Sequence, residues 1–362
     1  LPEYREYERA STTAINAYVS PVLDRYLHQL ESALPSAHSL RIMQSNGGNI
    51  STQEARRNGV RCILSGPAGG VIGARLTGAW ANEAIADFSP SIPDQAKPMK
   101  LITFDMGGTS TDVSLIDGEP QTTTDATISG YPIRIPILDI HTIGAGGGSI
   151  AYLDAGGALR VGPESAGADP GPACYGKGDL PTVTDANLVL GRLLPQSFLG
   201  GEMPLDGERA FHALSRLGKE MGMDADRAAL GVIAVANAHM ERALRLISVE
   251  RGYDPRRFSL MAFGGAGGLH AVDLARRLGI PTVIAPPLAS TLSAFGMLAA
   301  DVVKDYTQTV MLPGNTPHQQ IMDLLEPFIH RGREEIQAQG IAAQKIMIET
   351  FLDMRYAGQS YE

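Results

Sequence analysis

Cysteine is scarce in this sequence of 362 residues, which contains only Cys62 and Cys174. The two lie far apart and follow neither a CxxC pattern nor a zinc-ligand spacing, so a cysteine-built zinc site is not expected. Such cysteine usage is typical of a reduced compartment, and we predict a cytoplasmic protein without a disulfide. The sequence also lacks a run of 18 apolar residues and a basic-then-apolar leader, so no membrane span or signal peptide is expected.

The sequence has fewer basic than acidic residues. The 30 Lys and Arg residues are outnumbered by 39 Asp and Glu residues, which gives a formal net charge of -9. Without a Lys/Arg-rich run, this balance argues against a nucleic-acid partner. Hydrophobic residues make up 44% and charged residues 19%, an ordinary composition for a folded globular protein. At roughly 150 residues per domain, the length predicts about two domains.

Glycine is abundant, with 41 residues, and it is clustered. A glycine turn between a strand and the next element lets backbone N–H groups approach a phosphate without interference from a Cβ. We interpret four such segments as strand-associated turns: 65–70, 105–112, 144–149 and 264–268.

The segment 105–112 is the most specific of the four. Asp105 ends a strand and precedes Gly107, Gly108, Thr109 and Ser110, so 101–116 is predicted to be a β-hairpin with a glycine-rich tip. A carboxylate at this place can hold a hydrated Mg²⁺ while the turn holds the phosphate that the metal bridges. An ordinary hairpin with a solvated Asp105 is the alternative. Neither the P-loop pattern nor the dinucleotide-binding fingerprint is present.

The remaining patterns predict alternating strands and helices. We expect strands at 40–43, 62–64, 101–104, 111–116, 260–263 and 283–285, with further strand up to Thr142. Helices are expected at 3–34 with an interruption at Pro21, and at 71–86, 188–194, 207–221, 225–251, 269–278 and 290–301. The stretch 88–98 has a linker composition, and 151–181 is expected to be an ordered loop around a site.

Three further polar residues are candidate metal ligands. Asp139 and His141 are two apart in a strand-like run, so they project from one face and could share a divalent ion, or they could be hydrogen-bonded loop anchors. Asp185 lies at a predicted helix start, where an N-cap is the structural alternative. A carboxylate and an imidazole suit Mn²⁺ or Zn²⁺, but two ligands do not identify an ion.

Two other candidates have structural explanations. Cys174 has no placed base beside it, so a packed small side chain is favoured over a nucleophile. His270 follows the glycine segment 264–268, where it could face a nucleotide or serve helix packing.

Six motifs, in this order, resemble the hydantoinase A/5-oxoprolinase family. They are LSGPAGG, FDMGGTSTDV, DIHTIGAGGGS, AGADPGPACYG, TDANL and FGGAGGLH, and the resemblance runs from about residue 3 to residue 305. It implies an α/β protein with an actin/hexokinase-like ATPase fold, in which two ribonuclease-H-like domains close on ATP. The implied units are the remainder of the first such domain at 1–98, the second at 99–312, and the start of a C-terminal extension at 313–362.

The resemblance also implies a site. It makes 105–112 a phosphate loop, 263–270 an adenosine loop, and 65–70 and 290–300 two connecting helices. On this basis the catalytic carboxylates are Asp105 and Asp112. The ATP-binding residues so implied are Gly107, Gly108, Thr109, Ser110, Gly264, Gly265, Gly267 and Gly268. The candidate metal ligands, for Mg²⁺ or otherwise Mn²⁺ or Zn²⁺, are Asp105 together with the three residues taken above from their places in the sequence, Asp139, His141 and Asp185.

The function implied is the ATP-using subunit or domain of a cyclic amide hydrolase, which opens a hydantoin or 5-oxoproline ring after phosphorylating its carbonyl. The family resemblance further implies a hydantoinase B-type subunit or fused domain as partner, within an oligomer. A ketone carboxylase subunit and an actin-like nucleotide switch without small-molecule chemistry are the alternatives. Because the sequence begins at Leu1 and lacks the family's first Asp-x-Gly-Gly-Thr hairpin, we expect a piece of a longer polypeptide.

Overall fold

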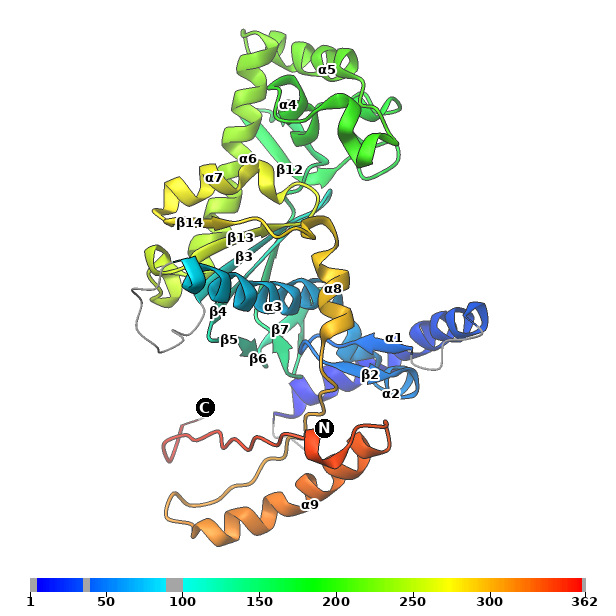
Figure 1. Cartoon of the computed structure of the whole chain (residues 1–362), viewed down its shortest axis with the longest axis vertical. Helices are drawn as coiled ribbons and strands as arrows, with labels where there is room; N and C mark the ends of the chain where they lie inside the picture. Colours follow the sequence, from blue (N-terminus) through cyan, green and yellow to red (C-terminus); the bar gives the residue numbers. More distant parts are fainter. Residues whose placement is uncertain (1–4, 35–39, 89–99, 360–362) are drawn as a thin grey trace.

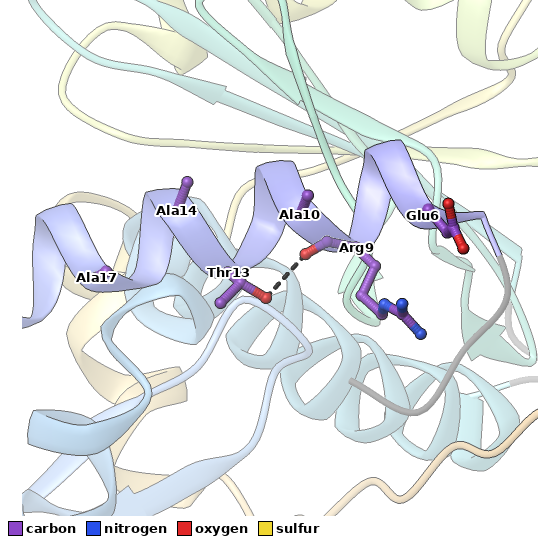
Figure 2. Close-up of a pocket in the computed structure, with 6 residues that line it drawn as sticks. All are labelled: Glu6, Arg9, Ala10, Thr13, Ala14 and Ala17. Atoms are coloured by element: carbon purple, nitrogen blue, oxygen red, sulfur yellow. Dashed lines mark hydrogen bonds between the residues drawn. The ribbon is translucent and has the colours of Figure 1, made fainter.

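The computed structural model describes residues 5–34, 40–88 and 100–359, and it shows a mixed α/β protein. A central sheet has the strand order β10-β4-β3-β13-β14, with the short β5 paired to the edge of β4 (Figure 1). The strands β3, β4 and β10 are antiparallel neighbours, whereas β13 is parallel to both β3 and β14. The strands of this sheet are β3 (Lys100–Met106), β4 (Thr111–Asp117), β5 (Glu119–Pro120), β10 (Ile140–Ile143), β13 (Ser259–Phe263) and β14 (Thr282–Ile284).

The central strands are apolar on both faces because helices cover both sides of the sheet. On β3, Ile102, Phe104 and Met106 belong to the core on one side, and Leu101 belongs to the core on the other. Phe263 on the neighbouring β13 is also part of this second core. The alternation along each strand therefore divides the hydrophobic residues between two cores.

The larger core is built by α4 (Val183–Val189), α5 (Gly207–Glu220), α6 (Ala225–Ile247) and α7 (Gly267–Leu278). The helices predicted at 207–221 and 225–251 are confirmed as α5 and α6, although α6 ends at Ile247 and a 3₁₀ helix follows at Val249–Arg251. Asp206 and Asp224 cap the two helices with side-chain hydrogen bonds. The prediction of a loop over 151–181 is wrong in part. Its first half belongs to the hairpin of β11 (Ser149–Leu153) and β12 (Leu159–Ser165).

The smaller core lies under two crossing helices, α3 (Ser65–Phe88) and α8 (Leu292–Ala299) (Figure 1). The interpretation of 65–70 as a glycine turn is wrong, because these residues form the first turns of α3. No strand precedes α3 at 62–64, because a 3₁₀ helix ends at Cys62 (Gly59–Cys62) and a turn at Ile63 and Leu64 joins it to α3. The family resemblance placed connecting helices at 65–70 and 290–300. Residues 65–70 are wholly helical, and α8 covers Leu292–Ala299 of the second range.

An N-terminal unit packs below the sheet. Its helix α1 (Glu6–Ala33) runs without a break through Pro21, so the predicted interruption is wrong; the proline occupies an exposed position on the helix. The rest of the unit contains β1 (Arg41–Met43), β2 (Asn49–Ser51) and α2 (Thr52–Arg57). The short strands β6 (Thr122–Thr123), β7 (Ala126–Ile128), β8 (Tyr131–Ile133) and β9 (Ile137–Leu138) pair as β6 with β9 and β7 with β8.

After α8 the chain returns to the N-terminal unit. Asn49 forms a parallel bridge with Val302, and its N–H donates to the carbonyl of Asp301 at 2.7 Å. The helix α9 (His318–Gln337) follows. The linker predicted at 88–98 lies, apart from Phe88, outside the described residues. Within the described ranges, no helix combines the length and hydrophobicity that a membrane crossing requires.

Short 3₁₀ helices join several of these elements. Besides Gly59–Cys62 they are Ala173–Tyr175, Pro195–Gly201, Val249–Arg251, Pro255–Arg257, Ala289–Thr291 and Ala343–Lys345. Of the helix predicted at 188–194, only the first two residues are helical. Helix α4 begins at Val183, where Thr182 caps it, and ends at Val189.

Candidate active site

Asp105 and Asp112 face each other across the β3–β4 hairpin. They are direct partners in the antiparallel register, so both side chains lie on the same face of the sheet. Burial, followed by the charge of Asp112, raises the pKa of Asp105 to about 6, and the Ser293 hydroxyl, 3.5 Å away on α8, works in the opposite direction. Burial likewise raises the pKa of Asp112, whereas the hydrogen bond that the Thr142 hydroxyl donates to it at 2.5 Å lowers this pKa. Two partly desolvated carboxylates thus meet at one end of the sheet.

Two other glycine segments converge on the turn of this hairpin. The N–H groups of Gly147 and Gly148 donate to the carbonyls of Gly107 and Gly108 at 2.9 and 2.6 Å. From the third segment, the Ala266 N–H donates to the Met106 carbonyl at 2.9 Å. Segments that lie up to about 160 residues apart in sequence therefore form one hydrogen-bonded backbone layer around Asp105.

Close approach explains why glycine is needed in this layer. A Cβ on Gly146 would lie 2.7 Å from the Gly108 carbonyl, and one on Gly264 would lie 2.4 Å from a carboxylate oxygen of Asp105. Gly264 also has φ of +77°, in the left-handed region that favours glycine. The two glycines thus let the loops close around the carboxylate.

Other glycines of the predicted site are open to solvent. Gly108 and Thr109 are exposed at the hairpin tip, where Gly107 and Ser110 are half-buried and closed by a 3.0 Å hydrogen bond. A Cβ on Gly108, Gly265 or Gly268 would have no neighbour within 4 Å.

Gly267 differs from these open positions. It is buried at the start of α7, where a Cβ would lie 3.3 Å from the Phe104 carbonyl. Gly267 therefore lets α7 pack closely on β3, and its expected place beside adenosine stays a prediction.

The predicted metal cluster does not assemble around Asp139 and His141. The Asp139 carboxylate forms an ion pair with Arg251 through both guanidinium nitrogens, one of them at 3.2 Å from Oδ1. His141 lies opposite Val113 in the β10–β4 pairing. Among the residues that the structure describes, no group of three or more His, Cys, Asp or Glu side chains is arranged to hold a metal. Arg251 lies 112 residues from Asp139 and has no sequence signal that predicts the pair.

Asp185 has a structural role that accounts for its burial. Its carboxylate accepts hydrogen bonds from the N–H groups of Ala173, Cys174 and Thr182 and from the Thr182 hydroxyl, at 2.8–3.1 Å. It is the third residue of a capping box whose N-cap is Thr182, not the N-cap itself. Because both oxygens are occupied by donors, Asp185 is not placed as a metal ligand.

The two remaining candidates are also structural. Both cysteines are free in the structure. Burial followed by the nearby Asp185 raises the pKa of Cys174, which favours packing over nucleophilic chemistry. His270 is buried between Asn237, 2.7 Å from its Nδ1, and Asn187, 3.3 Å from its Nε2. Burial lowers the pKa of His270 to about 4, so the imidazole is neutral and serves the packing of α4, α6 and α7.

Ser293, Thr142 and Thr184 were missed by sequence reasoning. Ser293 and Thr142 each contact one of the paired carboxylates, and the Thr184 hydroxyl donates to the Gly147 carbonyl at 2.8 Å. Thr142 and Thr184 lie inside the motifs quoted above, but single hydroxyl residues carry no spacing signal of their own. The tertiary contact is what identifies them.

The family model described as hydantoinase/oxoprolinase matches residues 9–306 of this chain. The chain belongs to the hydantoinase/oxoprolinase family. All three converging glycine segments and both paired carboxylates fall within the matched range.

Named relatives support the assignment. The chain is 39% identical to the caprolactamase subunit alpha of Pseudomonas jessenii, over all of this chain and 51% of that protein. It is 37% identical to 5-oxoprolinase of Saccharomyces cerevisiae, over 99% of this chain and 28% of that protein. This hydantoinase/oxoprolinase chain thus spans about half of the first relative and less than a third of the second.

Solved structures agree with the fold. The ATP-dependent caprolactamase from Pseudomonas jessenii superposes with a TM-score of 0.78 at 37% identity, covering all of this chain and 52% of that one. A nucleotide-free acetone carboxylase superposes with a TM-score of 0.77 at 30% identity, covering 95% of this chain and 48% of that one. Both of these solved enzymes are ATP-dependent.

Proposed function

We propose that this chain is the ATP-using part of an ATP-dependent cyclic amide hydrolase. The observation that carries the proposal is the convergence of three glycine segments on the Asp105–Asp112 hairpin, which leaves the hairpin tip exposed. Relatives named caprolactamase and 5-oxoprolinase support a cyclic amide as the substrate class.

The strand order supports an actin/hexokinase-like architecture. If β3, β4, β10, β13 and β14 are numbered 1 to 5 along the chain, their order in the sheet is 3-2-1-4-5. Strands 1, 2 and 3 are antiparallel neighbours, and strands 4 and 5 run parallel to strand 1. We assign 99–312 to one ribonuclease-H-like domain, 1–98 to the remainder of another, and 313–362 to the start of an extension. The helices α3 and α8 then connect the two domains.

The backbone layer would hold the nucleotide. Gly107, Gly108, Thr109 and Ser110 form the turn that would bind phosphate oxygens through backbone N–H groups and hydroxyls. The backbone at Gly264, Gly265 and Gly268 would lie beside the adenosine, next to the hairpin through the Ala266 contact; Gly264 is packed against Asp105, and the other two positions are open.

The paired carboxylates suit Mg²⁺. This ion usually takes one or two carboxylates and completes its shell with water and substrate phosphates, so Asp105 and Asp112 are a sufficient protein contribution. Bound Mg²⁺ would neutralise charge on the transferring phosphoryl group. The described residues offer no third His, Cys, Asp or Glu ligand of the kind that Zn²⁺ sites use.

The chemistry explains the need for ATP. A cyclic amide is a poor electrophile, and transfer of the γ-phosphoryl group from ATP to its carbonyl oxygen, which releases ADP, activates the ring carbon. Water would then add to that carbon, the ring C–N bond would break as its nitrogen takes a proton, and a second water would release phosphate from the resulting acyl phosphate. The chain's own contribution is positioning and charge stabilisation by oriented N–H groups. Asp105 would orient the reacting groups, with Ser293 and Thr142 holding the two carboxylates in place.

A ketone carboxylase subunit is the second candidate. It is favoured by acetone carboxylase, whose structure superposes almost as well as that of caprolactamase. In such an enzyme the same site would phosphorylate the ketone or bicarbonate. Assays with 5-oxoproline, hydantoin, caprolactam and acetone as phosphoryl acceptors distinguish the candidates.

A partner completes the proposal. Because the similar caprolactamase chain is named subunit alpha, we assign ring opening to an assembly with a second, hydantoinase B-type subunit or domain. The two free thiols support a reducing, cytoplasmic compartment.

Calorimetric titration with Mg-ATP tests the nucleotide site. We expect saturable binding that Asp105→Asn weakens by about tenfold or more, because it removes the charge that faces the metal. Asp226→Asn, at an exposed position on α6, is the matched control and should bind like the parent. Equal affinity of the parent and the Asp105→Asn variant would contradict the assignment of Asp105.

A further inference from the structure

A polar cavity of about 160 Å³ lies away from the hairpin site, between the N-terminal unit, the segment after α8, and α9. Gln44, Glu54 and Arg61 line it from the N-terminal unit, and Lys304 and Glu335 line it from the other two parts. Pairs of lining residues more than 200 positions apart in sequence meet here. The site proposed for ATP uses none of these side chains.

One wall of the cavity is an ion-pair network, in which Glu54 accepts from Lys304 and Asn58, two of the roughly four donors that a carboxylate can take. Lys304, whose side chain is 10% exposed, contacts Glu54 at 3.2 Å and Glu335 at 3.0 Å. Glu335 also accepts from the Tyr306 hydroxyl at 2.8 Å and from Arg331 at 2.7 Å. These groups have short, complementary partners, and they hold the return segment and α9 against the N-terminal unit.

Arg61 on the opposite wall is held differently. Its guanidinium lies 3.5 Å from the Asp305 carboxylate, 3.5 Å from the Gln44 side-chain oxygen and 3.4 Å from the Asp305 carbonyl. Ordinary N–H···O distances are about 2.9 Å, so these contacts are long. Asp305 has a closer partner in Asn46, at 2.6 Å. Arg61, with a side chain 23% exposed, therefore keeps the capacity for two parallel hydrogen bonds to a carboxylate.

Charge and size restrict what could bind. The cavity is lined by three cations, Arg61, Lys304 and Arg331, and by three anions, Glu54, Asp305 and Glu335. With no net charge, the lining favours a ligand that carries both signs over a simple anion or cation. A cavity of about 150 Å³ holds a benzene molecule, so the volume suits a ligand of similar size.

We propose that this cavity binds a small zwitterionic amino acid, with its carboxylate on Arg61 and its ammonium group facing Glu54. Such a ligand would exchange the long contacts of Arg61 for short ones and would balance the charge at both ends. Because it would bridge the N-terminal unit and the segment that follows α8, it would also stabilise the junction between them.

Calorimetry with 4-aminobutyrate, in the absence of nucleotide, tests the proposal on the 362-residue chain. Propionate and propylammonium each carry one of its charges, and 2-pyrrolidinone is the same skeleton closed into a lactam. We expect saturable binding of 4-aminobutyrate and at least about tenfold weaker binding of the other three, because each lacks one or both charges.

Variants at Arg61 complete the experiment. Arg61→Gln should weaken 4-aminobutyrate binding by about tenfold or more, and Arg61→Lys, which preserves the charge and the fold better, should weaken it too by losing the paired hydrogen bonds. Arg57→Gln, at an exposed position on the neighbouring α2, should leave binding unchanged.

Three results would overturn the proposal. They are no binding of 4-aminobutyrate, equal binding of propionate or 2-pyrrolidinone, and unchanged affinity in both Arg61 variants. Since no nucleotide is present, each result is independent of whether the hairpin site binds ATP.

Discussion

At the scale of single residues, glycine has two separate uses around the hairpin site. Gly146 and Gly264 are needed because another chain segment occupies the place of their Cβ atoms, whereas Gly108, Gly265 and Gly268 face open space. The sequence shows five similar glycines, and only their surroundings divide them into packed and open positions.

Substitution by alanine should separate these two groups. Gly146→Ala places a methyl group 2.7 Å from the Gly108 carbonyl, so we expect a loss of at least about 1 kcal/mol in unfolding free energy and weaker Mg-ATP binding. Gly268→Ala, at an open position on α7, is the control and should retain the stability of the parent. Urea denaturation of both variants measures the difference, and equal stability would contradict the close contact.

The buried His270 predicts a pH dependence of stability. Its pKa is about 4 in the folded protein and near 6.5 when unfolded, so the unfolded state binds more protons between these values. This residue therefore destabilises the fold as pH falls from about 6.5 towards 4, by up to about 1.4 kcal/mol per pH unit.

Comparison with His270→Gln isolates this contribution. The variant should be less stable than the parent at pH 7.5, because it disrupts the contacts with Asn187 and Asn237, and the gap should narrow at pH 5. Urea denaturation at the two pH values provides the measurement. A gap that stays constant would show that His270 is not held neutral by burial.

At the scale of elements, the crossing of α3 and α8 depends on three glycines. A Cβ on Gly69 or Gly73 would lie 2.6 or 2.5 Å from carbonyl oxygens of α8, and one on Gly296 would lie 1.9 Å from the Gly69 carbonyl. The glycine run at the start of α3 resembles a turn in sequence, but it serves close helix packing. Ser293 of α8 contacts Asp105, so the helix crossing also positions the site.

Gly296→Ala should therefore force the two helices apart. We expect a loss of about 3 kcal/mol in unfolding free energy, at the upper end of overpacking effects, and weaker Mg-ATP binding because Ser293 moves with α8. Gly66→Ala on α3 has open space around its Cβ and a higher helix propensity, so it should be neutral or stabilising. Thermal unfolding compares the two, and a stable Gly296→Ala protein would refute the tight crossing.

At the scale of the whole molecule, the proposed site requires several distant segments to come together. The hairpin, the 144–149 segment and the β13–α7 junction each supply part of one backbone layer. A ligand bound there should stabilise the folded state as a whole, since the unfolded chain has no such layer.

Mg-ATP should accordingly raise the free energy of unfolding. At a concentration about 100 times the dissociation constant, the expected gain is about 2.7 kcal/mol, visible as a shift of the urea midpoint. Asp105→Asn should reduce the shift, and the Asp226→Asn control should preserve it. A midpoint that does not respond to Mg-ATP in the parent would count against the nucleotide site.

The sequence by itself determined the elements whose signals are local. The β3–β4 hairpin, the strand β13 followed by α7, and the long α6 were predicted because alternation, glycine position and helical periodicity all act over a few residues. The family motifs also singled out Asp105 and Asp112 as candidates, and the strand register pairs them. Local signals failed at 65–70 and in part of 151–181, where glycine and proline are compatible with both regular and irregular structure.

Only the tertiary structure decided what each polar side chain does. The Asp139 carboxylate forms an ion pair with Arg251, and the Asp185 carboxylate belongs to the capping box of Thr182. Ser293, on a helix 188 residues along the chain, contacts Asp105. Such pairings depend on which faces of distant elements meet, and burial then sets the pKa of groups such as Asp105 and His270. The spacing of residues in the sequence gives neither the pairing of distant side chains nor their burial, so both were known only from the folded chain.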